Sequence, residues 1–506
     1  MGIPSYFSYI IRNYKGIITP LDKSINFKHL FMDCNSIIYD CLHNLNNPTD
    51  NEVISTVIQK IKYYIKTVNP SHTIFIAFDG VAPFAKMEQQ RVRRYKNDFL
   101  GRVLSDDTQE PKWNTSKITP GTLFMKQLSY QISMEFKNFK NENSIKNIIV
   151  SAANEEGEGE HKIFQYIREN PLLDDDVLIY GLDSDLFMLS IFNYKYVKNF
   201  YIFRETPEFL NTLIDISDNV DFHIVDIFKL RTAILSNMGF HDPQRIYDYA
   251  FLCFLLGNDF LPHFPSLNIR THGIQTLLDI YNEYFKNKNS DFLVSKNGIQ
   301  WKHVEYIIKR LSILEKDFLI EEINMRKKFD KWDWKEPNTI DEKAKLIDNF
   351  PILYRAEEIY INPGFNGWED RYYKVLFPMN NKGSNPTFSE NEKEKFRKEI
   401  CLNYFEGLEW VYKYYIGNPI DWRWKYKYNY GPLFTDLKKY IPRRELIKNN
   451  RLPFSSDEQL IYVLPRTQYH LLPNNLSLEL NNIKSNNKMD FQWAFCKKTW
   501  ESKIKY

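Results

Sequence analysis

The sequence predicts an α/β fold in which a mainly parallel central sheet is flanked by helices, followed by a mostly helical, aromatic-rich second region. Two patterns carry this prediction. Through the first 270 residues, short and nearly continuous apolar runs alternate with helical patterns, as in parallel sheets that are buried on both faces. Further along the chain the pattern becomes helical and charged, and aromatic residues gather between Tyr404 and Leu472.

Four apolar runs are the predicted strands of the sheet. They are residues 29–33, 73–79, 147–153 and 177–183. Helical patterns lie between them, around residues 52–68, 121–138 and 160–168. Residues 277–330 are predicted to be helical and charged, and residues 331–400 carry the poorest signal, which predicts loops or insertions.

The composition excludes several classes of protein. With 43% hydrophobic and 26% charged residues, the chain is neither wholly disordered nor fibrous. Its five cysteines are scattered without a CxxC pair, which argues against a disulfide framework or a zinc site and favours a reducing compartment, the cytoplasm with the nucleus as the alternative. No stretch reaches the ~18 apolar residues of a membrane span, so we expect neither secretion nor membrane insertion.

Seven acidic residues each follow a predicted strand or another apolar segment. They are Asp33, Asp79, Glu158, Glu160, Asp183, Asp185 and Asp259. Ligands bind outside the carboxyl ends of the strands in open α/β sheets, so we expect one shared site at this edge. Flexible glycines beside Glu158 and Glu160 let both turn toward that edge. If the chain stays extended, Asp183 and Asp185 point the same way.

So many neighbouring carboxylates would repel one another, which makes a bound cation part of the prediction. For any single residue, a solvated loop position or a helix cap is an ordinary alternative, but it explains the whole set poorly. Oxygen ligands without a Cys or His cluster favour Mg²⁺ or Mn²⁺, and two such ions are the usual device for in-line displacement at phosphorus. His161 and His263 lie beside these segments and are expected to cap or orient rather than to bind metal.

A basic helix is predicted directly after Asp79. Lys86, Gln90, Arg93 and Arg94 are spaced at i, i+4, i+7 and i+8, which places them on one face. The guanidinium groups of arginines can each donate two hydrogen bonds to a phosphate, and the lysine ammonium attracts its charge, particularly that of a terminal phosphate. The alternative is an ordinary solvated surface helix.

Several segments, in order along the chain, resemble the motifs of the XRN-type 5′→3′ exoribonucleases, here as a compact member without the long C-terminal extensions of the large relatives. They are MGIPSYF, FMDCNSIIYD, FDGVAPFAKMEQQRVRRYK, ITPGTLFM, EGEGEHKIFQYIR, IYGLDSDLFMLS, LLGNDFLPHFPSL, EGLEWVYKYYIGNPIDWRWKYKYNYGPLFTDL and PFSSDEQLIYVLP. The resemblance is densest over residues 1–270 and about 367–472, and residues 331–366 match none of these motifs.

This resemblance implies a nuclease core of the PIN and flap-nuclease type and a processive enzyme that degrades single-stranded RNA with a 5′ monophosphate to mononucleotides. It marks the seven acids as the catalytic and metal-binding set, and Lys86, Gln90, Arg93 and Arg94 as the 5′-phosphate pocket. It also divides the chain into a nuclease domain over residues 1–270, a helical connector with a variable insertion over 271–400, and a second XRN-like region over 401–506 that packs on the nuclease core.

Base stacking is predicted for aromatic residues near the site. The family usually has histidine where this chain has Tyr39, and a tyrosine ring can also stack on a base. Trp422 and Trp424 lie among Arg423, Lys425 and Lys427, a pattern that suits a single-stranded channel, although tryptophans in such a block are also common core residues.

Two other functions remain open. A structure-specific DNA 5′ nuclease of the flap-endonuclease type would use a similar acidic sheet edge, but the second aromatic block and the QQRVRRYK helix argue against it. A non-catalytic RNA-binding scaffold would keep the fold, but the unbroken acidic set argues against that function.

Overall fold

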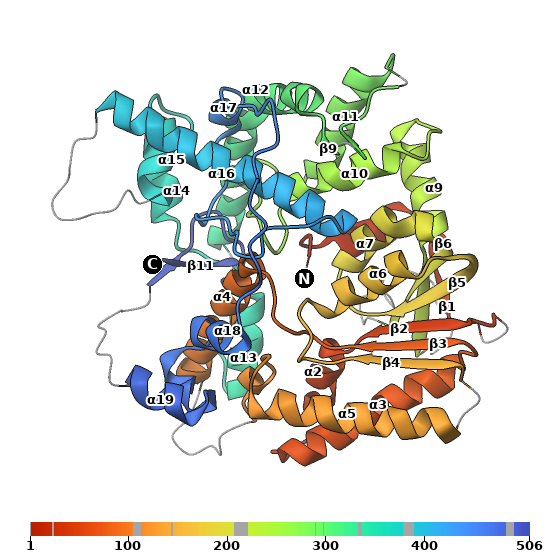
Figure 1. Cartoon of the computed structure of the whole chain (residues 1–506). Coiled ribbons are helices and arrows are strands. Elements are labelled where there is room, and N and C mark those ends of the chain that lie inside the picture. The colour runs from red at the N-terminus through yellow and green to blue at the C-terminus, as the bar shows by residue number, and fades with distance from the viewer. Residues whose placement is uncertain are drawn as a thin grey trace.

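The computed structural model describes residues 2–22, 25–104, 113–142, 145–206, 221–288, 290–296, 298–331, 336–377, 389–481 and 490–505. A seven-stranded sheet forms one half of the molecule, and a helical region lies beside it (Figure 1). In spatial order the strands are β1 (Ile18–Pro20), β7 (Phe222–Asp226), β6 (Val197–Glu205), β5 (Leu172–Tyr180), β2 (His29–Asp33), β3 (Thr73–Ala77) and β4 (Asn147–Ser151).

The mainly parallel sheet that the sequence predicts is confirmed. The five strands from β6 to β4 run parallel to one another, whereas β7 is antiparallel to β6 and β1 is antiparallel to β7. All four predicted strands are present, as β2, β3, β4 and β5. Strand β6 was not predicted, because Lys198, Asn199 and Arg204 interrupt its apolar residues. The short strands β1, at the edge of the sheet, and β7, between β1 and β6, were not predicted either.

Helices cover both faces of the sheet. On one face, Leu30 and Ile74 pack with α3 (Asp50–Val68) and α5 (Leu123–Glu142) in one apolar cluster. On the other face, Phe31 and Phe75 pack with α6 (Gly159–Glu169) and α7 (Asp185–Asn193). Neighbouring residues of a strand point to opposite faces, so a nearly continuous apolar strand supplies both clusters. The predicted helices between the strands are confirmed by α3, α5 and α6.

Helices dominate the rest of the chain, apart from the short strand pairs β8 (Val294–Ser295) with β9 (Gly298–Ile299), and β10 (Asp490–Gln492) with β11 (Lys503–Lys505). The remaining α-helices are α1 (Tyr6–Asn13), α2 (Asn35–His43), α4 (Phe84–Leu104), α9 (Ile227–Met238), α10 (Arg245–Cys253), α11 (Gly273–Phe285), α12 (Trp301–Lys327), α13 (Ile340–Asn349), α14 (Ala356–Ile361), α15 (Trp368–Leu376), α16 (Glu390–Ile416), α17 (Phe434–Leu437), α18 (Ser456–Val463) and α19 (Asn474–Asn481). Among the described residues, no helix combines the length and the apolar character needed to cross a membrane.

The expectation of loops over residues 331–400 is wrong for much of that segment, which forms α13, α14, α15 and the start of α16. Helix α13 begins at a side-chain cap, where Thr339 accepts a hydrogen bond from the backbone of Glu342. Its few apolar residues give little periodic signal, and its tertiary contacts were not visible in the sequence. The predicted loop residues 332–335 and 378–388 lie outside the described residues.

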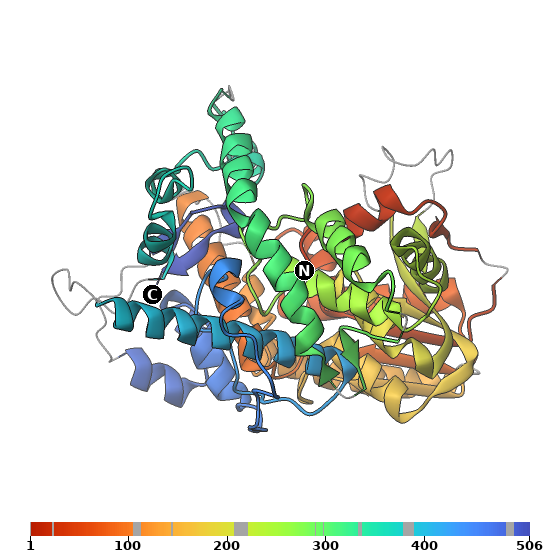
Figure 2. The same cartoon turned by 90° about the horizontal axis from the view of Figure 1, so that it is seen from above.

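Segments far apart in sequence share one large apolar core. It contains Tyr6 from α1, Phe187 from α7, Tyr249 from α10 and Trp410 from α16. Helix α4 leaves the edge of the sheet and reaches the C-terminal strands, and the two lie side by side in both views (Figures 1 and 2). The second region therefore packs directly over the edge where the acidic residues lie.

Candidate active site

The predicted acidic residues lie together at the carboxyl edge of the sheet. Asp33 ends β2, Asp79 follows β3, and Glu160 lies in the first turn of α6. Carboxylate oxygens of these three residues lie within 4.8 Å of one another. Glu158, which precedes α6 as its N-cap, has an oxygen within the same distance of Glu160.

A glycine allows the start of α6 to approach the strand ends. A Cβ atom on Gly159 would lie 2.5 Å from Oδ1 of Asp33, which is closer than any real contact. The Gly159 N–H donates a hydrogen bond of 2.8 Å to Oδ1 of Asp79. The flexible glycines that the sequence analysis noted are thus needed at this position for close approach, and they bring Glu158 and Glu160 to the site.

Asp183 and Asp185 reach the site by a different route from the one predicted. Strand β5 ends at Tyr180, and Asp185 is already the first residue of α7, so the chain between them is not extended. Asp183 acts electrostatically on both Asp33 and Asp259, and Asp259 acts on Asp185. The two carboxylates therefore share Asp259 as an electrostatic neighbour within one cluster.

Lys86 lies among the acids. Its Nζ is 2.5 Å from Oε2 of Glu158 and 2.7 Å from Oδ2 of Asp259, and the side chain is almost fully buried. Lys86 is predicted as a member of the 5′-phosphate pocket, and in this structure its ammonium forms ion pairs with two members of the acidic cluster. Because Lys86 precedes the other predicted pocket residues by a full turn of α4, it meets the sheet edge before the helix leaves it.

Burial and mutual repulsion raise the pKa values of several of these carboxyl groups. Burial, and then the charges of Asp79 and Asp183, raise the pKa of Asp33 well above its ordinary value. Burial, and then Glu158 and Asp33, do the same to the pKa of Glu160. Burial and the charge of Asp259 raise the pKa of Asp185 to about 7. One lysine is therefore too little positive charge for the cluster.

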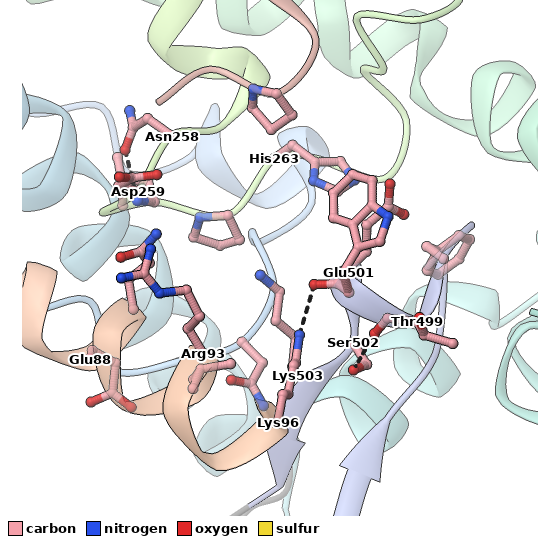
Figure 3. A pocket seen from close by; sticks show the side chains of 18 of the residues that line it. Glu88, Arg93, Lys96, Asn258, Asp259, His263, Thr499, Glu501, Ser502 and Lys503 are labelled. Carbon is pink, nitrogen blue, oxygen red and sulfur yellow. Dashed lines mark hydrogen bonds between the residues drawn. The ribbon is translucent and has the colours of Figure 1, made fainter. Parts of the chain in front are cut away.

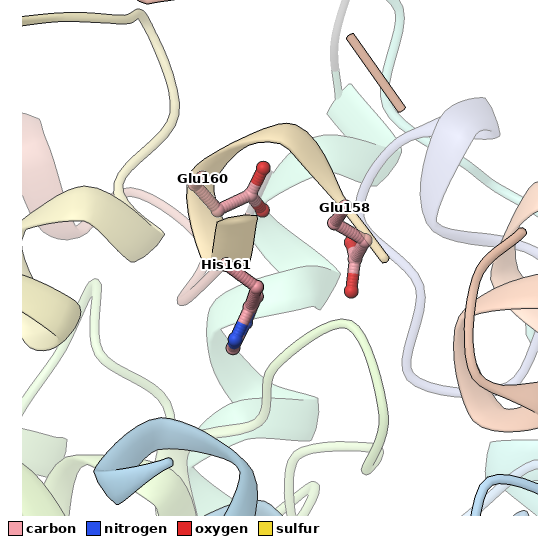
Figure 4. Close-up of side chains that lie close together, drawn as sticks. All are labelled: Glu158, Glu160 and His161. Atoms are coloured by element: carbon pink, nitrogen blue, oxygen red, sulfur yellow. The ribbon is translucent and has the colours of Figure 1, made fainter. Parts of the chain in front are cut away.

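The residues present fit a divalent cation. Oδ1 of Asp33 is buried and has no hydrogen-bond partner among the described residues, and Asp33, Asp79 and Glu160 offer oxygen atoms only, the ligands that Mg²⁺ and Mn²⁺ prefer. A second group places His161 with Glu158 and Glu160 around the first turn of α6 (Figure 4). The His161 ring stacks on Tyr414 at 3.6 Å, in keeping with the expected orienting role.

The proposed phosphate pocket is more buried than a solvated helix face. Gln90 and Arg94 are only 4% and 5% exposed. The Arg94 guanidinium donates to Oγ1 of Thr119 and to the backbone carbonyl of Ile118, and Gln90 accepts from Gln459 of α18. The alternative of an ordinary surface helix is thus excluded for these positions of α4.

Arg93 is exposed and faces Tyr39. Its guanidinium carbon lies 5.9 Å from the centre of the Tyr39 ring, and its Nη2 donates to the tyrosine hydroxyl at 3.4 Å. Tyr39, on α2, remains partly exposed. These two residues therefore meet beside the acidic cluster, where the sequence analysis predicted a phosphate contact and a stacking ring.

The two tryptophans have different environments. Trp424 is 7% exposed, and its ring stacks on Trp410 at 5.5 Å. A ring buried in this way offers no open face to a base, so the stacking hypothesis for Trp424 is corrected to a core role. Trp422 is half-buried, and its carbonyl accepts a hydrogen bond from the first residue of α4, Phe84.

Comparison with known protein families supports the resemblance over most of the chain. The family model described as "XRN 5'-3' exonuclease N-terminus" matches residues 1–206, and that described as "Xrn1 helical domain" matches 240–352 and 354–486. The chain belongs to the XRN 5′-3′ exonuclease family. The second match includes residues 331–366 apart from position 353, a segment in which no family motif was recognised.

Curated XRN relatives match nearly the whole chain. The 5′-3′ exoribonuclease 2 of Arabidopsis thaliana is 26% identical over 94% of this chain and 62% of its own length. The corresponding enzyme of Eremothecium gossypii is 30% identical over 79% and 49%, and the 5′-3′ exoribonuclease 1 of Saccharomyces cerevisiae is 25% identical over 94% and 40%. The chain therefore spans about two fifths to three fifths of the length of these relatives.

Similarity to solved structures is more remote. The catalytic core of Rad2 in complex with a DNA substrate covers 61% of this chain and 79% of its own, with a TM-score of 0.32 and 15% identity. A second such complex gives a TM-score of 0.33 at 14% identity. Similarity at this level does not bear on function.

The XRN helical region also supplies two site residues that the sequence analysis missed. The hydroxyl of Tyr415 donates to Oδ1 of Asp185 at 2.5 Å, and that of Tyr414 donates to Oε1 of Glu158 at 2.9 Å. Both tyrosines lie on α16 and are buried. Their partners are more than 200 residues away in sequence, so no local pattern could have distinguished them from the other tyrosines of the aromatic block.

Proposed function

We propose that this protein is a divalent-metal-dependent 5′→3′ exoribonuclease that degrades single-stranded RNA carrying a 5′ monophosphate to mononucleotides. One observation carries the proposal: in a chain of the XRN family, seven acidic side chains from separate segments converge on one edge of the sheet. The names of the curated relatives support the same activity. The chain spans about two fifths to three fifths of the length of those relatives.

The acidic cluster would hold two Mg²⁺ or Mn²⁺ ions, with Asp33, Asp79 and Glu160 as the group closest to a ligand geometry. Bound there, the ions would activate a water molecule and stabilise the leaving oxygen. The chain itself fixes the carboxylates: Gly159 donates to Asp79, and Tyr415 donates to Asp185. These hydrogen bonds hold the acids in place before a cation arrives.

Recognition of the 5′ end is assigned to the basic positions of α4. Arg93 is the exposed member and would make the direct contact, while Arg94 and Gln90 are held from behind by Thr119 and Gln459. A terminal monophosphate offers several oxygens to such a guanidinium group. A cap or triphosphate would have to enter a pocket whose inner wall is already buried.

Movement along the strand is assigned to Tyr39. Its partly exposed ring beside Arg93 is suited to stack on a base without sequence preference. The second stacking position is left to Trp422, which keeps some exposed surface, since Trp424 is buried in the core.

The deciding experiment offers one purified sample of the protein four 5′-labelled or body-labelled strands: RNA with a 5′ monophosphate, RNA with a 5′ hydroxyl, single-stranded DNA and a DNA flap. We expect Mg²⁺-dependent release of mononucleotides from the phosphorylated RNA and loss of activity in EDTA. Cleavage of the flap with no action on RNA would favour the DNA 5′ nuclease. Tight RNA binding without hydrolysis in Mg²⁺ or Mn²⁺ would favour the non-catalytic scaffold.

We also place the protein in a reducing compartment, the cytoplasm or the nucleus. All five cysteines are buried as free thiols, which supports this location. Imaging of a tagged chain, with fractionation as the second measurement, tests it.

A further inference from the structure

A cavity of about 660 Å³ lies along α4, on a different face of the helix from Gln90 and Arg94. Its walls come mainly from α4, the loop over residues 256–270 and the C-terminal segment over 491–503, and Gly2, Pro4, Ile347 and the segment over 425–429 also line it. Asp259 of the acidic cluster lies at one side of the cavity, and Glu501 lies at the opposite side (Figure 3). The cavity is therefore adjacent to the candidate active site.

Two lysines in this cavity lack a carboxylate partner. Lys96 of α4 and Lys503 of β11 both line it (Figure 3), and within the part of the chain that the structure describes neither forms an ion pair. Among the other charged lining residues, Arg270 pairs with Glu501 at 2.7 Å and Lys425 pairs with Glu88, whereas Arg93 also lines the cavity and forms no ion pair within the described part of the chain. Lys96, Lys503 and Arg93 thus give the wall an excess of positive charge.

The environment of Lys96 is costly for a cation. Burial, and then the charge of Lys503, lower the pKa of Lys96 to about 7. Its ammonium donates a hydrogen bond to the backbone carbonyl of Trp500 at 2.8 Å, and the charge of Glu501 is a smaller, favourable influence. An anion bound between the lysines would remove the repulsion and supply the missing counter-charge.

Aromatic rings with open surface line the same cavity. Phe99 is 40% exposed and Trp500 is 49% exposed, whereas most large aromatic side chains of the described residues are buried. The ring centre of Phe99 lies 5.2 Å from that of Phe491, and the ring centre of Phe491 lies 5.7 Å from that of Trp493. The Arg270 guanidinium lies 5.5 Å from the centre of the Trp500 ring, and the exposed parts of these aromatic rings are surfaces on which a nucleobase can stack.

We propose that this cavity binds a nucleoside 5′-monophosphate, the product that each hydrolysis would release, with the phosphate between Lys96 and Lys503 and the base against the aromatic wall. The inference rests on the proposed function for the identity of the ligand. The volume is in the range of small-molecule sites, about 300 to 1,000 Å³, which suits one nucleotide. The C-terminal wall lies beyond residue 486, where the second family match ends.

A binding experiment without hydrolysis tests the site. Adenosine 5′-monophosphate is titrated into the full chain in EDTA by calorimetry, with adenosine and inorganic phosphate as separate probes. We expect the monophosphate to bind at least about tenfold more tightly than either fragment. The double variant Lys96→Met with Lys503→Met should bind it at least about tenfold more weakly than the wild type. The control, Lys126→Met with Lys137→Met, changes two exposed lysines of α5 and should bind like the wild type.

A second variant tests whether weaker binding could result from a folding defect. Trp500→Ala removes a half-exposed ring and should weaken nucleotide binding while the melting temperature stays near that of the wild type. Absence of binding to the wild type, or equal binding by the wild type and both variants, would overturn the site. Binding of the monophosphate by a protein that hydrolyses no RNA would support the nucleotide site and overturn the proposed function instead.

Inhibition kinetics distinguish a binding site for the product from a binding site for the RNA strand. With phosphorylated RNA as substrate, added adenosine 5′-monophosphate should inhibit the lysine double variant about tenfold more weakly than the wild type, with kcat/KM for RNA unchanged. A parallel loss of kcat/KM would show that the cavity holds the RNA strand, and it would overturn the assignment to product.

Discussion

The carboxyl edge of the sheet and the aromatic block over residues 404–472 meet at the same site but contribute to it in different ways. At the sheet edge, the acidic residues follow short apolar segments, and burial among like charges raises the pKa values of Asp33 and Glu160. In the aromatic block most rings pack on one another, as Trp410 packs on Trp424, and only the hydroxyls of Tyr414 and Tyr415 reach the acids. Changes at the edge should therefore affect chemistry more than stability, and changes in the block should do the reverse.

The largest effect is expected from Asp185→Asn. Loss of one carboxylate from the cluster should lower kcat about a thousandfold or more, which corresponds to roughly 4 kcal/mol of transition-state stabilisation. The melting temperature without metal should not fall, because a repelling buried charge is removed without opening a cavity.

The matched control for that change is Asp174→Asn, an exposed acid of strand β5, which precedes α7, at the end of the strand away from the site. Single-turnover hydrolysis of phosphorylated RNA and thermal melts of both variants provide the comparison. Near-normal turnover by Asp185→Asn in Mg²⁺ would contradict the metal assignment.

Trp424→Ala should show the opposite behaviour. Removal of a large buried ring from its stack on Trp410 should lower the free energy of unfolding by about 3 to 5 kcal/mol, while the folded fraction retains its preference for phosphorylated RNA. Trp422→Ala, at a half-buried position, should cost less stability. Urea denaturation measures both. An unchanged free energy of unfolding, together with lower processivity on RNA, would support a stacking role for Trp424.

Arg93→Ala tests the exposed member of the phosphate pocket. Loss of a charge-assisted contact should reduce the preference for a 5′ monophosphate over a 5′ hydroxyl by about 10- to 150-fold, or 1.5 to 3 kcal/mol. Arg102→Ala on the same helix, away from the site, is the control. The ratio of kcat/KM for the two RNA ends is the measurement, and a variant as selective as the wild type would make Arg93 a solvated surface residue.

Tyr39→Ala should lower processivity. Stacking of a base on an aromatic ring stabilises binding by roughly 1 to 3 kcal/mol, so its loss should let partly degraded strands escape and accumulate. Tyr39→His should largely preserve the wild-type behaviour, because imidazole also stacks. Product ladders recorded with excess substrate and a trap for released enzyme are compared. Identical ladders for Tyr39→Ala and the wild type would exclude Tyr39 from the mechanism and leave the metal site unaffected.

The smallest effect concerns Mg²⁺ and pH. The folded pKa of Asp185, raised to about 7, lies above its unfolded value of about 3.9, so this residue contributes stability at low pH that is lost as pH rises between the two values. Mg²⁺ binds the deprotonated carboxylate, so it should stabilise the protein more at pH 7.5 than at pH 5.5. The gain at pH 7.5 should be about 1.4 kcal/mol when free Mg²⁺ is ~10 times its Kd.

Differential scanning fluorimetry at the two pH values, with and without Mg²⁺, measures this gain. The same titration with Ca²⁺ and with the Asp185→Asn variant provides the controls. An equal shift of the melting temperature at both pH values, or no shift at millimolar Mg²⁺, would count against the metal site.

Local patterns were sufficient for the sheet edge because each signal lies within a few residues. The apolar strands β2, β3, β4 and β5, and the acids that follow them, could be found without tertiary information. Strand β6 could not, because its charged residues break the apolar run. The geometry of Asp183 and Asp185 was also missed, since α7 begins immediately after β5 and the chain turns between the two residues.

The sequence by itself therefore determined the parallel sheet, the order of its acids and the basic character of α4, because a strand's burial and a residue's charge are local properties. Only the tertiary structure decided which groups meet: that Lys86 neutralises Glu158 and Asp259, that Trp424 is core, that Tyr415 holds Asp185, and that Lys96 and Lys503 share a cavity. These outcomes depend on the packing of segments hundreds of residues apart, where an ammonium, a ring or a hydroxyl is placed by its neighbours in space, and no period or spacing along the chain encodes that placement.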